Sequence, residues 1–258
     1  MLFETVEFTC ADGIARVTLN RPDRLNALDA TLIRELTAAA SLIAADPSVR
    51  AVLLAANGRA FCSGADLQGD VTADIETRLR EAFNPMISAW YHLPLPVVVA
   101  VQGIAAGAGM SLALAGDIVI AAQSAVFMQL FAPRLGLMPD LGSSFHLPRN
   151  VGSARARGLA LLGDPLPAAE AASWGLIWAC VEDAALGHES LGLATRLSTG
   201  PTQAYRQIKA VFNAQPEHSL EAQLDIELRG QTALGKTRDF AEGLSAFRNK
   251  RKPAFRGE

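Results

Sequence analysis

VVVAVQGIAAGAGMSLALAGDIVIAA, residues 97–122, is the longest apolar stretch in the chain, and the rest of the sequence is organised around it. Its length and hydropathy resemble those of a membrane-spanning helix. Three glycines within residues 103–109 would interrupt such a helix. The stretch instead predicts, in order, a buried strand over Val97–Val101, a glycine-rich turn, a short helix over Met110–Ala115 and a second buried strand over Ile118–Ala122.

This order of strand, turn and helix leaves backbone N–H groups pointing outward where the helix begins. Such groups stabilise negative charge, either on a bound anion or on an oxyanion that forms during a reaction. Alternatively, the small residues only allow close backbone packing. The stretch by itself favours neither interpretation.

The composition of the whole chain limits its class and its partners. With 258 residues, half of them apolar, it can bury a large core, and a net charge of −3 gives no reason to expect nucleic acid as a partner. Cys10, Cys62 and Cys180 lie too far apart for a metal-ligand motif and fit free thiols in a reducing compartment. The first ten residues lack the pattern of a signal peptide. We therefore expect a cytoplasmic protein without a metal site.

The N-terminal segment predicts a crossover unit. Thr5–Thr9 and Ile14–Leu19 alternate around Asp12-Gly13, which is typical of a hairpin. After a polar loop, Asp29 can cap a helix, and Ala51–Ala56 reads as the next strand. A strand, a long helix and a strand in this order indicate a right-handed crossover between parallel strands.

A second small-residue turn follows, at Ser63-Gly64 within RAFCSGADLQ. We expect an exposed backbone N–H at Ala65 beside it. Cys62 has no basic partner nearby in sequence, so it is interpreted as an inert, packed thiol.

From Val71 to Trp90 the apolar residues have helical spacing, and Pro85 should kink that helix, with His92 at its end. The prolines and glycines of Ala125–Arg149 predict an irregular loop. The remaining helices are predicted at Ser153–Leu162, Ala168–Trp174, Glu182–Ser198, Thr202–Ala214 and Ser219–Phe247.

Within that loop, Asp140 is the only acidic residue between Asp117 and Asp164. Its neighbours Leu137, Met138 and Leu141 predict an apolar setting that raises the pKa of its carboxyl. Alternatively, Pro-Asp is a common turn dipeptide.

Six stretches, in chain order, resemble the crotonase family, the enoyl-CoA hydratase/isomerase superfamily, and together they cover nearly the whole chain. They are NRPDRLNALD (20–29), AFCSGADL (60–67), PVVVAVQGIAAGAGMSLALAGDIVIAA (96–122), GLMPDLGSSFHLPR (136–149), AASWGLI (171–177) and AEGLSAFRNKRKPAFRG (241–257). The resemblance implies an α/β fold, a crotonase-like spiral of ββα turns over residues 1–200. It also implies a helical C-terminal region, residues 201–258, for CoA contact and for assembly as a homotrimer or a dimer of trimers.

The resemblance implies an acyl-CoA thioester as substrate, with coenzyme A as part of it and no tightly bound cofactor. The family polarises the thioester carbonyl with two backbone N–H groups, which by motif are those of Ala65 and Ala108. Glycine is common in the family at the position of Ala108, so the methyl group here narrows the pocket. The residues matched to CoA contacts are Arg24, Leu25, Ala27, Ser63, Asp66 and Leu67, with Lys250 reaching a phosphate, often in a neighbouring subunit.

The acidic residues separate the reactions within the family. Hydratases use two glutamates, because one activates water while the other serves the carbon beside the carbonyl. Ser111 holds the first position here, and Phe131 or Ala132 the second. Asp140 instead resembles the single acid of family isomerases, including those of the phenylacetate-pathway type. The resemblance therefore implies an enoyl-CoA isomerase that moves a proton from C2 to C4 through a dienolate.

Three alternatives stay open. Family membership alone would suggest a hydratase, although both glutamates are missing. Asp140 also resembles the nucleophilic aspartate of dehalogenating members, but His92 is out of register with their histidine. Finally, the chain could be a non-catalytic acyl-CoA-binding protein in which Asp140 is a turn residue.

Overall fold

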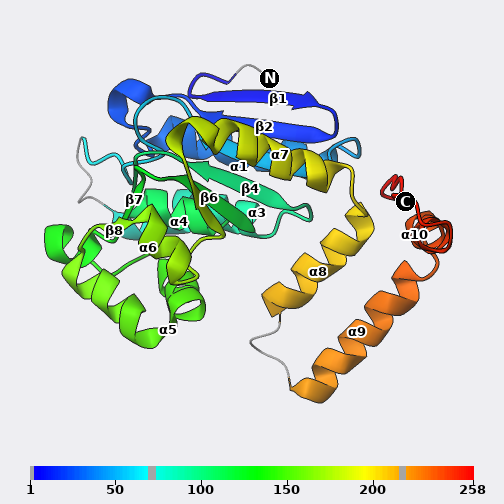
Figure 1. The fold of residues 1–258 in the computed structure, drawn as a ribbon. Coiled ribbons are helices and arrows are strands. Elements are labelled where there is room, and N and C mark those ends of the chain that lie inside the picture. The colour runs from blue at the N-terminus through cyan, green and yellow to red at the C-terminus, as the bar shows by residue number, and fades with distance from the viewer. Residues whose placement is uncertain (1–2, 69–73, 215–218) are drawn as a thin grey trace.

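The structure is a computed structural model that describes residues 3–68, 74–214 and 219–258. Two sheets form its centre, with strand orders β1-β2-β3-β4-β6-β9 and β5-β7-β8 (Figure 1). The strands are β1 (Val6–Ala11), β2 (Ile14–Leu19), β3 (Ala51–Ala56), β4 (Val97–Val101), β5 (Ile104–Ala106), β6 (Ile118–Ala122), β7 (Val126–Met128), β8 (Leu166–Pro167) and β9 (Ala179–Val181).

The helices surround these sheets and continue beyond them at the C-terminal end (Figure 1). They are α1 (Ala30–Ala45), α2 (Ile75–Arg78), α3 (Asn84–Tyr91), α4 (Ala108–Leu114), α5 (Ser143–Leu162), α6 (Ala168–Ser173), α7 (Leu186–Ser198), α8 (Thr202–Ala214), α9 (Leu220–Leu234) and α10 (Arg238–Arg248). Pro22–Arg24 and Asp183–Ala185 form 3₁₀ turns, and Leu79–Phe83 and Phe131–Leu135 are π-helical.

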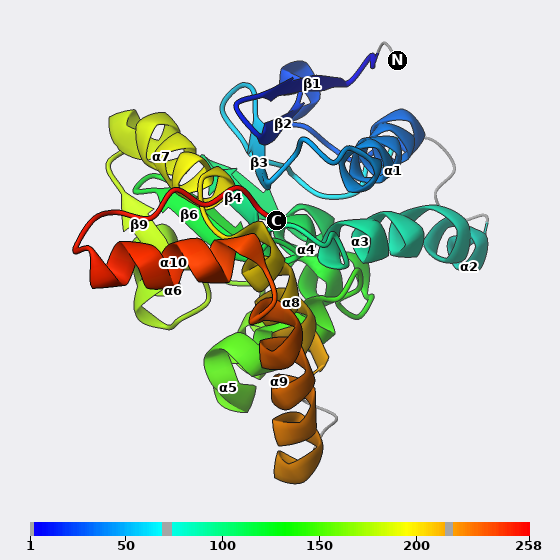
Figure 2. The same ribbon diagram turned by 90° about the vertical axis from the view of Figure 1, so that its right-hand side faces the viewer.

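Strand β4 lies at the centre of the large sheet, and all of its side chains are buried. It pairs in parallel with β3 and β6. Figure 2 shows α7 on one face of this sheet and α1 on the other, with α3 beside α1. Because a parallel sheet covered on both faces needs apolar residues on both sides, the continuous run of valines suits this place. No helix within the described ranges has the length and apolarity to cross a membrane.

The predicted crossover unit is confirmed. Asp12 and Gly13 close the β1–β2 hairpin with φ of 54° and 75°. The Oδ1 atom of Asp29 accepts a hydrogen bond of 2.8 Å from the backbone N–H of Leu32, which caps α1. The next strand, β3, pairs in parallel with β2.

Three predicted elements are wrong. The turn after β4 contains the short strand β5, and the loop predicted over Ala125–Arg149 holds β7, a π-helical turn and the start of α5. These segments are too short to show a sequence period. The single helix predicted over Ser219–Phe247 is two helices. Helix α9 ends at Leu234 with Gly235 as its C-cap, and the hydroxyl of Thr237 caps α10 by accepting from the N–H of Phe240 at 3.1 Å.

The predicted kink at Pro85 takes the form of a π-helical turn. Proline has no N–H to donate to the preceding turn, and the N–H of Asn84 bonds to the carbonyl of Leu79, five residues back. Val71, the predicted start of this helix, lies outside the described residues. The described helical run therefore begins at α2 and ends at α3, where His92 is the C-cap residue.

The C-terminal helices stand beside the sheets rather than over them (Figure 1). Helix α9 has no buried residue, and three leucines along one side of it, Leu220, Leu224 and Leu228, are 52–68% exposed. The final residues return to Arg50, whose guanidinium donates to the backbone carbonyl of Phe255 at 3.4 Å. The leucines of α9 form an apolar stripe on the outside of the molecule.

Candidate active site

Two loops come together where the large sheet meets the small one. Cys62 pairs with Ala105 of β5 as an isolated bridge, and the N–H of Ala106 donates to the Cys62 carbonyl at 3.0 Å. A Cβ atom at Gly109 would overlap that carbonyl, and one at Gly64, where φ is 110°, would lie 3.0 Å from the Ala106 carbonyl oxygen. Glycine at these two positions therefore lets the loops approach each other.

This approach places Ala65 and Ala108 at one cavity. Leu28 donates to the Gly64 carbonyl and accepts from the N–H of Asp66, so the N–H of Ala65 points away from Leu28. Ala108 is the first residue of α4, where an N–H has no partner inside the helix. Among the described residues, neither N–H has a hydrogen-bond acceptor.

The cavity has a volume of about 260 Å³ and a mainly apolar lining. Asp140 is the only carboxylate among the described residues that line it, and Arg78 is the only cation. A volume of this size suits a small acyl group. The other lining residues are Leu67, Ile75, Leu79, Phe83, Phe131, Leu135, Leu137 and Leu141, with the two alanines named above.

The carboxyl of Asp140 is in a low-dielectric setting. Burial raises its pKa to about 6, and its Oδ1 atom has no hydrogen-bond partner among the described residues. Of the three sequence neighbours expected to cause this, Met138 is 72% exposed, whereas Leu137 and Leu141 line the cavity. The apolar setting therefore comes from the folded cavity as well as from adjacent residues. A carboxylate with this pKa can accept and return a proton near neutral pH.

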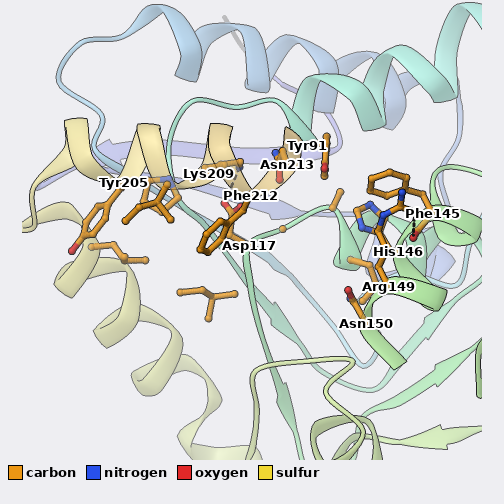
Figure 3. A pocket seen from close by; sticks show the side chains of 17 residues that line it. Tyr91, Asp117, Phe145, His146, Arg149, Asn150, Tyr205, Lys209, Phe212 and Asn213 are labelled. Carbon is orange, nitrogen blue, oxygen red and sulfur yellow. Dashed lines mark hydrogen bonds and ion pairs between the residues drawn. The ribbon is translucent and has the colours of Figure 1, made fainter. Parts of the chain in front are cut away.

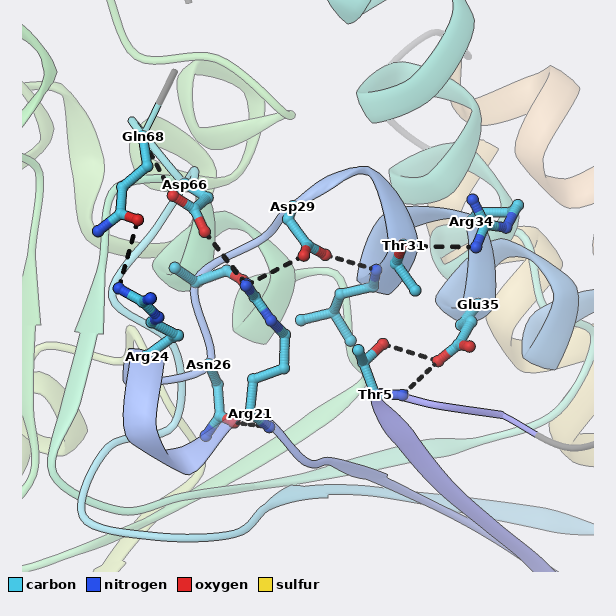
Figure 4. Close-up of polar contacts among 12 residues, drawn as sticks. Thr5, Arg21, Arg24, Asn26, Asp29, Thr31, Arg34, Glu35, Asp66 and Gln68 are labelled. Atoms are coloured by element: carbon cyan, nitrogen blue, oxygen red, sulfur yellow. Dashed lines mark hydrogen bonds and ion pairs between the residues drawn. The ribbon is translucent and has the colours of Figure 1, made fainter.

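The segments matched to CoA contacts lie together (Figure 4). The N–H of Ser63 donates to the Leu25 carbonyl at 3.0 Å, and Arg24 reaches the side chain of Gln68 at 3.3 Å. Arg21, which the sequence reasoning did not select, joins the two segments. It forms ion pairs with Asp29 at 3.0 Å and with Asp66 at 3.3 Å.

Arg21 also donates to the carbonyl of Ala27. The side chain of Asp66 and the carbonyl of Ala27 are therefore engaged within the chain, while Arg24 and Leu67 are exposed. In the sequence, the polar loop over residues 20–29 contains two acids and two arginines, which indicates ion pairs in general but not which residues form them.

Lys250 is not brought to this cavity within one chain. It is an exposed residue just beyond α10, which lies on the side of the molecule away from β7 and β8 (Figure 1).

The other candidate side chains lie outside the cavity. Cys62 is fully buried, and burial raises the pKa of its thiol to about 12, so the thiol is inert at neutral pH. His92 is exposed at the end of α3. His146 is buried, which lowers its pKa to about 4. No cluster of three or more metal-ligating side chains occurs among the described residues.

A second cavity, of about 470 Å³, lies between α5 and α8 (Figure 3). His146 lines it, Lys209 is paired with Asp117 at 2.7 Å, and the guanidinium of Arg149 stacks 3.6 Å from the ring centre of Phe145. None of the residues predicted to be catalytic or to bind CoA lines this larger cavity.

Comparison with known proteins identifies the family. A family model described as enoyl-CoA hydratase/isomerase matches residues 9–258. The chain belongs to this family. Solved structures of family members share its fold, the crotonase-like spiral. One is an enoyl-CoA hydratase from Bacillus anthracis, with 30% identity, a TM-score of 0.92 and coverage of 99% of this chain and 100% of that one.

Curated family relatives carry different activities in their names. A "Probable enoyl-CoA hydratase" from Rhodobacter capsulatus is 49% identical over the full length of both chains. The 1,2-epoxyphenylacetyl-CoA isomerase of Escherichia coli is 43% identical and covers 95% of this chain and 96% of its own. A trans-2-decenoyl-[acyl-carrier-protein] isomerase from Streptococcus mutans is 34% identical over both full lengths. Membership of the family therefore does not by itself choose the reaction.

Proposed function

We propose that the protein is an acyl-CoA isomerase that moves a double bond with Asp140 as its acid–base group. The observation that carries this proposal is a cavity lined by Ala65, Ala108 and Asp140, in which Asp140 is the only carboxylate among the described residues. The 43% identity to an epoxyphenylacetyl-CoA isomerase supports it. Phe131, one of the two positions (with Ala132) that the resemblance matches to the second hydratase glutamate, lines the cavity with an aromatic ring.

In the proposed reaction the ionised Asp140 removes a proton from C2 of a 3-enoyl thioester. The electron pair of that C–H bond moves into the carbonyl, and the two N–H groups stabilise the resulting dienolate oxygen. The protonated Asp140 then returns its proton at C4, which leaves a 2-enoyl thioester. One carboxylate suffices because the dienolate is planar, so a group on one face of it can reach both C2 and C4.

A screen of CoA thioesters with 3-enoyl, 2-enoyl and aromatic-derived acyl groups tests the proposal. We expect isomers of unchanged mass and exchange of the C2 protons with deuterated water. Addition of one water to a 2-enoyl thioester would indicate a hydratase. An acyl adduct on Asp140 would indicate a hydrolase that uses it as a nucleophile. Binding without either turnover or exchange would indicate a non-catalytic acyl-CoA-binding protein.

CoA recognition is expected at the segments around Arg24 and Ser63. Isothermal titration should show binding of acyl-CoA, and Arg24→Ala should weaken it by about three- to tenfold, because backbone groups supply the remaining contacts. Arg16→Ala, a loss of the same charge from an exposed position in β2, is the control. No binding at millimolar acyl-CoA would contradict this assignment.

Self-association as a trimer or a pair of trimers is proposed from the family resemblance and from the exposed leucines of α9. An apolar stripe on a helix without buried residues favours a covering partner. Leu224→Asp with Leu228→Asp should shift sedimentation toward the monomer, because charge at a buried interface is costly. Leu42→Asp, at an exposed leucine in α1, should not. A monomeric parent protein at micromolar concentration would refute both the assembly and a role for Lys250 in another subunit's site.

A further inference from the structure

A buried polar network contacts the backbone carbonyl of Asp140, and its side chains do not line the cavity. The side-chain amide of Gln129 donates to Ser143 Oγ at 2.9 Å, and Ser143 Oγ lies 2.7 Å from Ser111 Oγ. Ser111 Oγ in turn lies 3.1 Å from the backbone carbonyl of Asp140. Gln129, Ser143 and Ser111 each have 0% exposure. Because Gln129 supplies a hydrogen to Ser143, the hydroxyl of Ser143 is free to donate to Ser111, and that of Ser111 to Asp140.

The loop that carries Asp140 is held to the core by the buried side chain of Leu141, and its preceding residues are exposed. Residues 134–138 are exposed, and Leu141 and Gly142 have φ of 50° and 83°. The carbonyl of Asp140 accepts from the N–H of Ser143 at 3.0 Å, which is a contact inside the same turn. Ser111 therefore supplies a bond from this carbonyl to a different element, helix α4.

The same helix carries the proposed oxyanion donor, because Ala108 begins α4 and Ser111 lies three residues later. The hydroxyl of Ser111 also lies 3.2 Å from the Gly107 carbonyl, but that carbonyl already accepts the N–H of Ser111 at 3.0 Å. The hydroxyl is thus dispensable for the start of the helix. The contact that the Ser111 hydroxyl makes outside its own helix turn is with the backbone carbonyl of Asp140.

We propose that Ser111 and Ser143 are positioning residues that fix Asp140 relative to the N–H of Ala108. The inference rests on the proposed function, in which these two groups act on C2 and on the carbonyl oxygen of one substrate. A misplacement of about 1 Å between catalytic groups is enough to lower a rate substantially. Ser111, at a position that hydratases fill with an acid, would then support the base instead of contacting substrate.

The test measures C2 deuterium exchange and turnover of 3-hexenoyl-CoA in the full-length protein. We expect Ser111→Ala to lower kcat and exchange by about 10- to 100-fold, with KM within about twofold of the parent value. Ser143→Ala should lower them by about three- to tenfold, because it removes only the donor behind Ser111. Ser190→Ala, at a buried serine of α7 bonded to the Gly187 carbonyl, is the matched control and should change them less than twofold.

Two further measurements separate positioning from general structure. The infrared carbonyl frequency of bound acyl-CoA should be the same in the parent and in Ser111→Ala, because the N–H donors remain. In an Asp140→Asn background, Ser111→Ala should cause no further loss, because its effect passes through the carboxylate.

A Ser111→Ala effect no larger than that of Ser190→Ala would overturn the proposal. It would also be overturned if Ser111→Ala lowered the rate as much in the Asp140→Asn background as it does in the parent protein. If Ser111→Ala does not fold, Ser143→Ala carries the same comparison. Full activity of Asp140→Asn itself would instead refute the proposed function, so the two failures are distinguishable.

Discussion

Asp140→Asn should lower isomerase turnover by roughly 10²- to 10⁴-fold, which is the usual contribution of a positioned general base. The amide is nearly isosteric with the carboxyl, so we expect the fold and acyl-CoA binding to persist. C2 exchange with deuterated water should fall in parallel, because it needs the base and the oxyanion donors but no water nucleophile. Steady-state kinetics with mass-spectrometric detection of exchange measures both. Retention of full turnover and exchange would show that another group moves the proton.

The pH profile gives the same variant a second readout. Asp140 acts as a base only when it is ionised, and burial raises its pKa to about 6. The parent kcat should therefore fall about tenfold for each pH unit below that value and level off above it. The residual activity of Asp140→Asn should lack this acidic limb.

The stability of Asp140→Asn should change in the opposite sense to its activity. The unfolded pKa is about 3.9, below the folded value, so the folded state becomes less stable as pH rises from about 4 through 6. The asparagine amide does not ionise, so the variant avoids the free-energy cost of ionising a buried carboxyl. We expect a melting temperature a few degrees above that of the parent at pH 8, and no such gain at pH 4.

Ala108→Pro should lower turnover by roughly 10²- to 10³-fold, because it removes one of the two proposed oxyanion donors. Ala108 is the first residue of α4, where proline is tolerated because no intrahelical hydrogen bond uses that N–H. We therefore expect a folded protein whose bound thioester carbonyl is less polarised. Turnover, circular dichroism and the infrared frequency of bound acyl-CoA measure these three consequences.

Ala108→Gly is the matched control, since it keeps the N–H and removes only the methyl group that narrows the pocket. Its turnover should stay within a few-fold of the parent value, with a wider tolerance of acyl groups. Equal losses in the proline and glycine variants would show that the N–H of Ala108 is not the group that matters.

The sequence by itself determined the parts of this fold that depend on local pattern. The apolar run Val97–Val101 predicted a buried strand because a parallel sheet covered on both faces has no polar side. The Asp12-Gly13 turn and the Asp29 cap were readable because their chemistry acts within a few residues. Six ordered motifs, from residue 20 to residue 257, also identified the family and with it the spiral fold, which periodicity does not show.

The resemblance named Ala65 and Ala108 as a pair, but only the tertiary structure shows how distant residues such as these meet. The loops of Ala65 and Ala108 lie at one cavity because Gly64 and Gly109 let two backbones touch, and no sequence period reports such a contact. Burial raises the pKa of Asp140, and the cavity that it lines includes residues as distant in sequence as Phe83, because desolvation depends on what surrounds a carboxyl in space. Likewise, the hydrogen bonds that join Gln129, Ser143 and Ser111 need geometry within a few tenths of an ångström, which only the packed chain supplies.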